Sequence, residues 1–299
     1  EFIIYVNMLT WPVASIGWVT SLVQEAEASQ KRINEFLKET PSILNTNETP
    51  TPIKGNIVFK DVYFTYEDTK IEALKGVSFE VEKGTTLAII GNTGSGKSTI
   101  LELIGRLYDV DSGSIEIDGV AIKTLNLNTL RTSIGFVPQD PFLFSDSLKN
   151  NIKFGKNNAT ATEVIEAAKK AVVHENIINF KKGYDTILGE RGITLSGGQK
   201  QRVSIARAFI KRPQILLLDY CLSAVDTETE EQILNNIELV TKNKTTIIVS
   251  HRISSAKNAD TIIVLNDGMI AQKGTHNELI CVEGYYKELY QKQLRESSN

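Results

Sequence analysis

Apolar and polar positions divide the chain into an N-terminal helical stretch and a larger mixed region. Residues 1–23 carry a single charge, at Glu1, and residues 20–38 continue with apolar side chains at helical spacing. A run of about 20 apolar residues can cross a bilayer. We expect residues 1–38 to be the end of a membrane helix from a longer protein, packed against other helices because of its polar side chains and Pro12. A buried helix of a soluble protein is the alternative.

A linker and an α/β domain follow this helical stretch. Residues 39–54 are rich in Pro, Thr and Asn, which is typical of a linker. Alternating stretches after Gly55 predict an antiparallel β subdomain at the sheet edge, and helical patterns predict a helical subdomain over about 140–210. Residues 55–299 therefore read as an α/β fold with a mostly parallel sheet. Its parallel strands are expected at the continuous apolar runs 86–90, 215–219, 245–250 and 261–265.

The net charge and the cysteine content limit the classes of partner and the cellular compartment that we expect. The chain has 33 basic and 36 acidic side chains, a formal net charge of -3. A nucleic-acid-binding surface normally needs a basic excess, so we expect no nucleic-acid partner. Cys221 and Cys281 are too few for a disulfide framework and are expected to be reduced thiols in the cytosol.

The sequence GNTGSGKST, residues 91–99, lies between an apolar run and a helical pattern and fits the phosphate-loop motif. Its glycines let backbone N–H groups face phosphate oxygens, and the following helix adds unpaired N–H groups. This context disfavours a chance glycine-rich turn. Lys97 is expected to neutralise phosphates and Ser98 to bind Mg²⁺. The ATP-binding residues expected here are Gly91, Asn92, Thr93, Gly94, Ser95, Gly96, Lys97, Ser98 and Thr99.

Asp219 ends the apolar run ILLLD and offers a second oxygen ligand for Mg²⁺. An apolar strand that ends in Asp is weak evidence by itself, because many core strands do. Together with the lysine loop, it indicates a nucleoside triphosphatase.

The pentapeptide LSGGQ, residues 195–199, closely resembles the signature of ABC proteins when it accompanies a phosphate loop. Further motifs resemble that family in order: Tyr66 the aromatic that stacks on adenine, Gln139 the Q-loop glutamine, Asp226 the D-loop and His251 the switch histidine. Each alone has a plainer interpretation, which their order and spacing disfavour. The resemblance covers residues 55–299 and implies a P-loop NTPase core that binds ATP and Mg²⁺, with Gln139 beside Ser98 and Asp219 at the metal.

The resemblance also implies a dimer. In ABC proteins, two ATP molecules are held head to tail between two ATP-binding domains, and the signature of one domain closes over the ATP of the other. The residues that would contact ATP across the interface are Ser196, Gly197, Gly198, Gln199 and Asp226.

Two segments resemble exporter-type ABC proteins in particular. GERG, residues 189–192, resembles the exporter X-loop, and residues 1–38 resemble the last transmembrane helix and its cytoplasmic extension. Residues 140–155 would contact coupling helices of the membrane domain, although a plain surface loop remains possible. The resemblance implies a cell-membrane protein whose ATP-binding domain lies on the cytoplasmic face and whose partner includes its own transmembrane domain.

One residue departs from the family pattern. The catalytic glutamate that normally follows the strand-ending Asp is Tyr220 in this chain. A phenol is neutral at pH 7 and is a poor general base, and losing such a base typically costs ~10²–10⁴ in rate. We expect a degenerate site in which His251 and Gln139 remain, paired with a second half-transporter in a heterodimer. A slow homodimeric exporter and a regulatory ATP-dependent clamp without hydrolysis are the alternatives.

Overall fold

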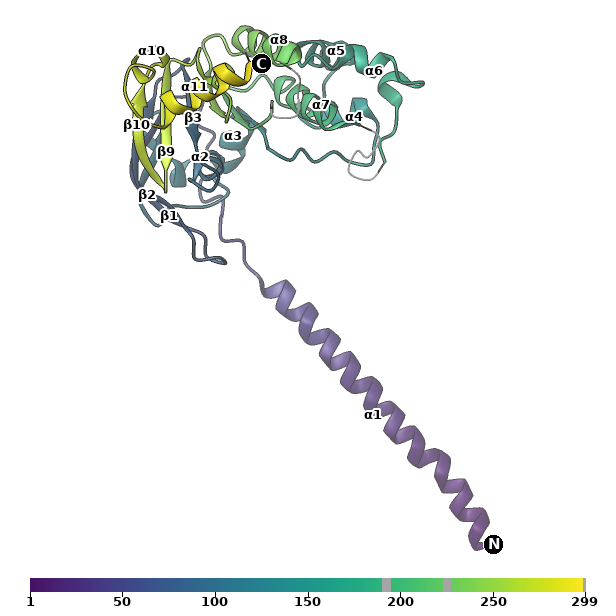
Figure 1. Ribbon diagram of the computed structural model, residues 1–299. Coiled ribbons are helices and arrows are strands. Elements are labelled where there is room, and N and C mark those ends of the chain that lie inside the picture. Colours follow the sequence, from purple (N-terminus) through teal and green to yellow (C-terminus); the bar gives the residue numbers. More distant parts are fainter. Residues whose placement is uncertain (190–194, 223–226, 298–299) are drawn as a thin grey trace. The chain divides into compact units, whose positions relative to one another are not determined.

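The computed structural model describes residues 1–189, 195–222 and 227–297 (Figure 1). The N-terminal segment Glu1–Leu44 is a compact unit of its own and consists mainly of helix α1 (Phe2–Lys38). No residue of α1 is buried, and among the described residues α1 is the one helix long and apolar enough to cross a membrane. The expected long N-terminal helix is thus present.

Polar side chains in α1 satisfy their own hydrogen bonds. Thr10 Oγ1 donates to the Val6 carbonyl at 3.1 Å, and Thr20 Oγ1 donates to the Ile16 carbonyl at 2.7 Å. Hydroxyls that bond back to the helix cost little in an apolar medium. These threonines are therefore a weaker argument against contact with lipid than the sequence pattern suggested.

The second unit, Asn45–Asn299, contains a six-stranded sheet of order β10-β9-β3-β8-β7-β6. All neighbours in this sheet are parallel except β10, which pairs antiparallel with β9. Every residue of β7 and β8 is buried, as their continuous apolar sequences predict. The strands are β3 (Thr86–Gly91), β6 (Ile134–Val137), β7 (Ile215–Asp219), β8 (Thr245–Val249), β9 (Thr261–Asn266) and β10 (Met269–Gly274).

The antiparallel strands form a separate four-stranded sheet of order β2-β1-β4-β5. Phe59 and Phe79 stack across the β1–β2 pair with ring centroids 4.4 Å apart. The Lys75 N–H donates to the Gly268 carbonyl at 2.9 Å, which joins β2 to the β9–β10 turn. This subdomain is therefore a sheet of its own beside the parallel one. Its strands are β1 (Ile57–Thr65), β2 (Glu72–Val81), β4 (Ser112–Ile117) and β5 (Val120–Ala121).

A helical insertion lies between β6 and β7, as predicted, and its helices gather at one end of this unit (Figure 1). Its α7 packs against α4 and α5 around a buried apolar cluster that includes Val203 and Ile205. The insertion comprises α4 (Leu148–Lys153), α5 (Ala161–Lys170), α6 (His174–Ile178), η2 (Gly183–Asp185) and α7 (Gly197–Phe209). The other helices are α2 (Lys97–Ile104), η1 (Ile122–Thr124), α3 (Leu127–Ser133), α8 (Thr227–Val240), α9 (Ile253–Ala256), α10 (His276–Leu279) and α11 (Tyr285–Ser297).

Part of the segment expected as a linker is bound to the second unit. The Asp118 carboxylate accepts the backbone N–H groups of Lys54 at 2.6 Å and Asn56 at 2.9 Å. Further upstream, Asn45 Oδ1 accepts the Leu127 N–H at 2.8 Å. Residues 45–56 therefore follow the surface of the second unit.

Candidate nucleotide site

The loop between β3 and α2 has a backbone that requires glycine. Gly96 has φ +94°, and a Cβ there would lie 2.4 Å from the Ala73 carbonyl oxygen. A Cβ on Gly91 would lie 2.1 Å from the Leu265 carbonyl oxygen. Such contacts are far inside van der Waals distance, so the close approach of neighbouring strands fixes this tight turn. The turn delivers the N-terminus of α2 to the end of the parallel sheet.

Lys97 is the first residue of α2, and its ammonium lies within the loop. Lys97 Nζ donates to Ser95 Oγ at 3.1 Å and to the Asn92 carbonyl. Burial lowers the pKa of Lys97 to about 8, and the Asp219 carboxylate opposes this shift. A buried cation held among loop oxygens at a helix N-terminus is suited to an anion.

Ser98 and Asp219 form a pair of oxygen ligands beside Lys97. Ser98 Oγ donates to Asp219 Oδ1 at 3.1 Å, and Asp219 is buried at the end of β7. Burial raises the pKa of Asp219, while the Ser98 hydroxyl opposes the shift. A hydroxyl and a carboxylate fit Mg²⁺, which prefers oxygen and takes its remaining ligands from water and phosphate. In the described ranges there is no cluster of three or more His, Cys, Asp or Glu side chains, so a cage made of protein ligands alone is not seen there.

Gln139 lies on an exposed bend two residues after β6. The register pairs Val137 of β6 with Leu218 of β7, so the chain leaves β6 at the same edge at which Asp219 ends β7. The structure thus brings Gln139 and Asp219 to the same end of neighbouring strands.

The rings of Tyr220 and His251 lie close together and tilted at that edge. Their ring centroids are 4.3 Å apart at 32°, and Lys97 Nζ lies 5.8 Å from the Tyr220 centroid. Burial and the Asp219 charge raise the pKa of Tyr220, so its hydroxyl is neutral. Burial and the Lys97 charge lower the pKa of His251, which makes its imidazole neutral at pH 7. The tyrosine ring therefore lies close to both the lysine and the histidine and brings no basic group.

Tyr66 lies beside α2. Its hydroxyl donates to Glu102 Oε2 at 2.8 Å and is 3.0 Å from Thr99 Oγ1. Its ring meets Phe64 and Tyr108 edge to face, with centroids 4.9 and 5.5 Å away. The structure places Glu102 and Tyr108 against Tyr66, and no sequence motif indicates either of these two residues.

Ser196 is the N-cap of α7. Its hydroxyl accepts the Gln199 N–H at 3.3 Å, and Gln199 Oε1 accepts the Ser196 N–H at 3.0 Å. This reciprocal capping box fixes the start of α7. Two of the predicted elements, Asp226 and the GERG residues from 190 on, lie outside the described residues.

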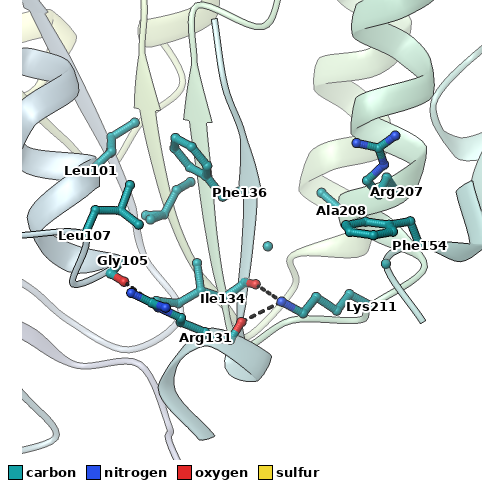
Figure 2. Close-up of a pocket in the computed structure, with 13 residues that line it drawn as sticks. Leu101, Gly105, Leu107, Arg131, Ile134, Phe136, Phe154, Arg207, Ala208 and Lys211 are labelled. Carbon is teal, nitrogen blue, oxygen red and sulfur yellow. Dashed lines mark hydrogen bonds between the residues drawn. The ribbon is translucent and has the colours of Figure 1, made fainter. Parts of the chain in front are cut away.

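A separate cavity of about 270 Å³ lies away from the phosphate loop (Figure 2). It touches Leu101, Gly105 and Leu107, at the C-terminal end of α2, whereas Lys97 begins that helix. Lys211 closes one side by donating to the Arg131 and Ile134 carbonyls at 2.5 and 2.6 Å. The cavity therefore differs from the phosphate site in two ways: its lining is mainly apolar, and it lies at the other end of α2.

The chain is similar to known proteins of one family. The family model described as "ABC transporter" matches residues 74–223. The chain is 44% identical to the probable multidrug resistance ABC transporter ATP-binding/permease protein YheI of Bacillus subtilis, over 98% of the chain and 50% of that protein. It is 42% identical to the multidrug resistance-like ATP-binding protein MdlA of Escherichia coli, over 100% of the chain and 50% of that protein.

A solved structure of a bacterial Atm1-family ABC exporter with ATP bound is also similar. It aligns with a TM-score of 0.87 at 38% identity, over 97% of this chain and 51% of that chain. The chain therefore spans about half the length of the proteins it matches here.

Proposed function

The chain belongs to the ABC transporter family, and from this membership we propose that it is the ATP-binding motor of an exporter. One observation carries the proposal: the Ser98–Asp219 pair lies next to the buried Lys97 at the N-terminus of α2. Those groups together suit a triphosphate and its metal ion.

This chain's own residues would bind Mg-ATP in distinct ways. Backbone N–H groups of residues 91–99 and the Lys97 ammonium would hold the phosphates. Ser98 and Asp219 would hold Mg²⁺, with Gln139 reaching it from the neighbouring strand end. Bound Mg²⁺ neutralises charge that builds on the phosphates. Tyr66 would stack on the adenine, and its hydroxyl bonds to α2 fix it near the phosphate loop.

A second copy or a related subunit would complete the site. Ser196, Gly197, Gly198 and Gln199 would contact ATP held by the partner, as would Asp226. In support, the capping box holds the start of α7, a helix of 13 residues whose first N–H groups favour an anion. ATP would then be closed between two subunits head to tail.

Hydrolysis in this subunit's own site would be impaired. Tyr220 is neutral and buried where a general base is needed, and its ring occupies the space beside His251. A partner that carries a glutamate would hydrolyse ATP against the intact signature of this chain. The pair would therefore be an asymmetric heterodimer.

The membrane domain would dock near the aromatic residues Phe142, Phe144 and Phe154, whose exposed fractions are 52%, 39% and 59%. Arg207 of α7 organises this surface: Nη1 donates to the Phe142 carbonyl at 2.8 Å and Nε to the Asn151 carbonyl at 2.9 Å. Its guanidinium also lies over two of the rings. Because Ser196 is the N-cap of α7 and Arg207 lies on the same helix, closure around ATP would move this surface. With α1 in the membrane, the ATP-binding domain would lie on the cytoplasmic face.

Binding of Mg-ATP tests this proposal. Titration of the chain with a fluorescent ATP analogue should give saturable binding that Lys97→Ala weakens at least about tenfold, since bonds to charged groups contribute about 1.5–3 kcal/mol. An absence of Mg-ATP affinity in the folded chain would refute the motor function. Equal turnover by the chain alone and with an active partner would instead favour a homodimer.

A further inference from the structure

His251 lies two residues after the end of β8, and a side chain from the C-terminal helix α11 bonds to the loop that carries it. Gln293 of α11 donates from Nε2 to the His251 carbonyl at 2.7 Å. Gln293 Oε1 also accepts the Ile253 N–H at 2.9 Å. The Gln293 amide thus bonds the residues on both sides of Arg252. Because one partner is an acceptor and the other a donor, these two bonds fix the orientation of the amide.

The second of these bonds serves the short helix α9, which begins at Ile253. Its N-cap residue, Arg252, makes no side-chain capping bond. The first N–H groups of a helix need partners from elsewhere, and Gln293 supplies one from 40 residues away. The geometry of the His251 loop therefore depends on α11.

Glu230 of α8 also bonds to this loop. This buried carboxylate of α8 pairs with Arg252 and accepts the hydroxyls of Ser254 at 2.8 Å and Ser255 at 2.7 Å. Glu230 thereby fixes the residues after Arg252 to α8, whereas Gln293 bonds the carbonyl of His251 itself. The bond from Gln293 is therefore made to His251 itself, and the bonds from Glu230 are made to residues that follow it.

We propose that Gln293 is a positioning residue that sets His251 for contact with the γ-phosphate of ATP, which makes the C-terminal helix part of the nucleotide site. The inference rests on the proposed role of His251 at that phosphate. Displacements of about 1 Å in a contact group can cost a large part of its effect. ATP and ADP differ by the γ-phosphate, so the ratio of their affinities reports on this contact and is insensitive to general docking of α11.

The experiment measures dissociation constants of Mg-ATP and Mg-ADP for the whole chain in detergent, by displacement of a fluorescent nucleotide. His251→Ala should reduce the preference for ATP at least about tenfold, as for a bond to a charged group. Gln293→Ala should reduce it about fivefold, as for one neutral hydrogen bond, with ADP affinity unchanged. Gln291→Ala is the matched control, because Gln291 is exposed on the same helix, and it should change neither constant.

Gln293→Glu separates the two bonds. A carboxylate still accepts the Ile253 N–H but cannot donate to the His251 carbonyl, so the ATP preference should fall as in Gln293→Ala while the helix end stays capped. This variant also carries the test if Gln293→Ala does not fold.

Each outcome decides between explanations. Unchanged ATP preference in the Gln293 variants, together with a loss in His251→Ala, overturns the positioning role and leaves the proposed function standing. Equal weakening of ATP and ADP in the Gln293 variants shows a structural role only and also overturns it. No effect of His251→Ala would remove the γ-phosphate contact itself and the inference with it.

Discussion

Replacing Tyr220 with glutamate tests why this site would hydrolyse ATP poorly. The wild-type ring is 8% exposed, and its neighbours are His251 at 4.3 Å and the Asp219 carboxylate. A glutamate there supplies the missing base, and a positioned general base contributes ~10²–10⁴ in rate. We expect Tyr220→Glu to raise turnover by at least about tenfold, because the neighbouring Asp219 charge and an imperfect fit reduce the full gain.

The same change should lower stability. Removing a buried aromatic ring costs about 3 kcal/mol, and each kcal/mol shifts the melting temperature of a domain this size by about 2–4 °C. Tyr220→Glu should therefore melt about 6–12 °C below the wild type. The assay is steady-state phosphate release at saturating Mg-ATP, run well below the melting temperature of each variant.

Three control variants separate the effect of adding a general base from the effect of removing the tyrosine ring. Tyr220→Gln matches glutamate in shape but offers no base, Tyr220→Phe keeps the ring, and Lys97→Ala in the Tyr220→Glu background removes phosphate binding. All three should stay at or below the wild-type rate. If Tyr220→Gln is as active as Tyr220→Glu, the ring acts by crowding alone. If Tyr220→Glu shows no gain while binding Mg-ATP normally, the missing base is not what limits hydrolysis.

Three further predictions concern the loop, its lysine and the docking surface. Gly96→Ala forces a Cβ to 2.4 Å from the Ala73 carbonyl and should weaken Mg-ATP binding at least about tenfold in a titration, whereas Gly94→Ala, with open space around its Cβ, should weaken it less. Lys97, with a pKa of about 8, loses its charge as pH rises, so Mg-ATP affinity should be about tenfold weaker at pH 9 than at pH 7; a flat profile contradicts this. Arg207→Lys keeps the charge but loses the guanidinium that bonds the Phe142 and Asn151 carbonyls. The unfolding free energy should therefore drop by about 2 kcal/mol in a denaturant melt, while ATP affinity stays within about twofold. An unchanged denaturation midpoint would show that these bonds matter little.

The local sequence predicted the turn and the strand that carry the candidate phosphate-binding residues. The turn at residues 91–99 follows from its glycines, and ILLLD predicts a buried strand that presents Asp219. These features are set by neighbours in the chain, so a motif captures them. The parallel strands β3, β7, β8 and β9 were predictable for the same reason, since each is a continuous apolar run, whereas the short β6 was not predicted.

Contacts between segments that are far apart in the sequence could not be predicted from local patterns. Nothing in the motif around His251 indicates that Gln293 bonds its carbonyl, because the two residues meet only after α11 has docked. The bond from Tyr66, which follows β1, to Glu102 of α2 likewise joins residues that are 36 positions apart in the sequence. Alternating residues predicted β1 and β2 but not β4 and β5, and the separation of these four strands into a sheet of their own depends on pairing that no local pattern encodes.

The binding of residues 45–56 to the second unit leaves a short linker segment between α1 and that unit. Only residues 39–44 separate the end of α1 from Asn45, whose amide oxygen accepts the Leu127 N–H. A stretch of that length reaches at most about 20 Å when fully drawn out. The first bond that tension in this segment would load is the one between Asn45 and Leu127.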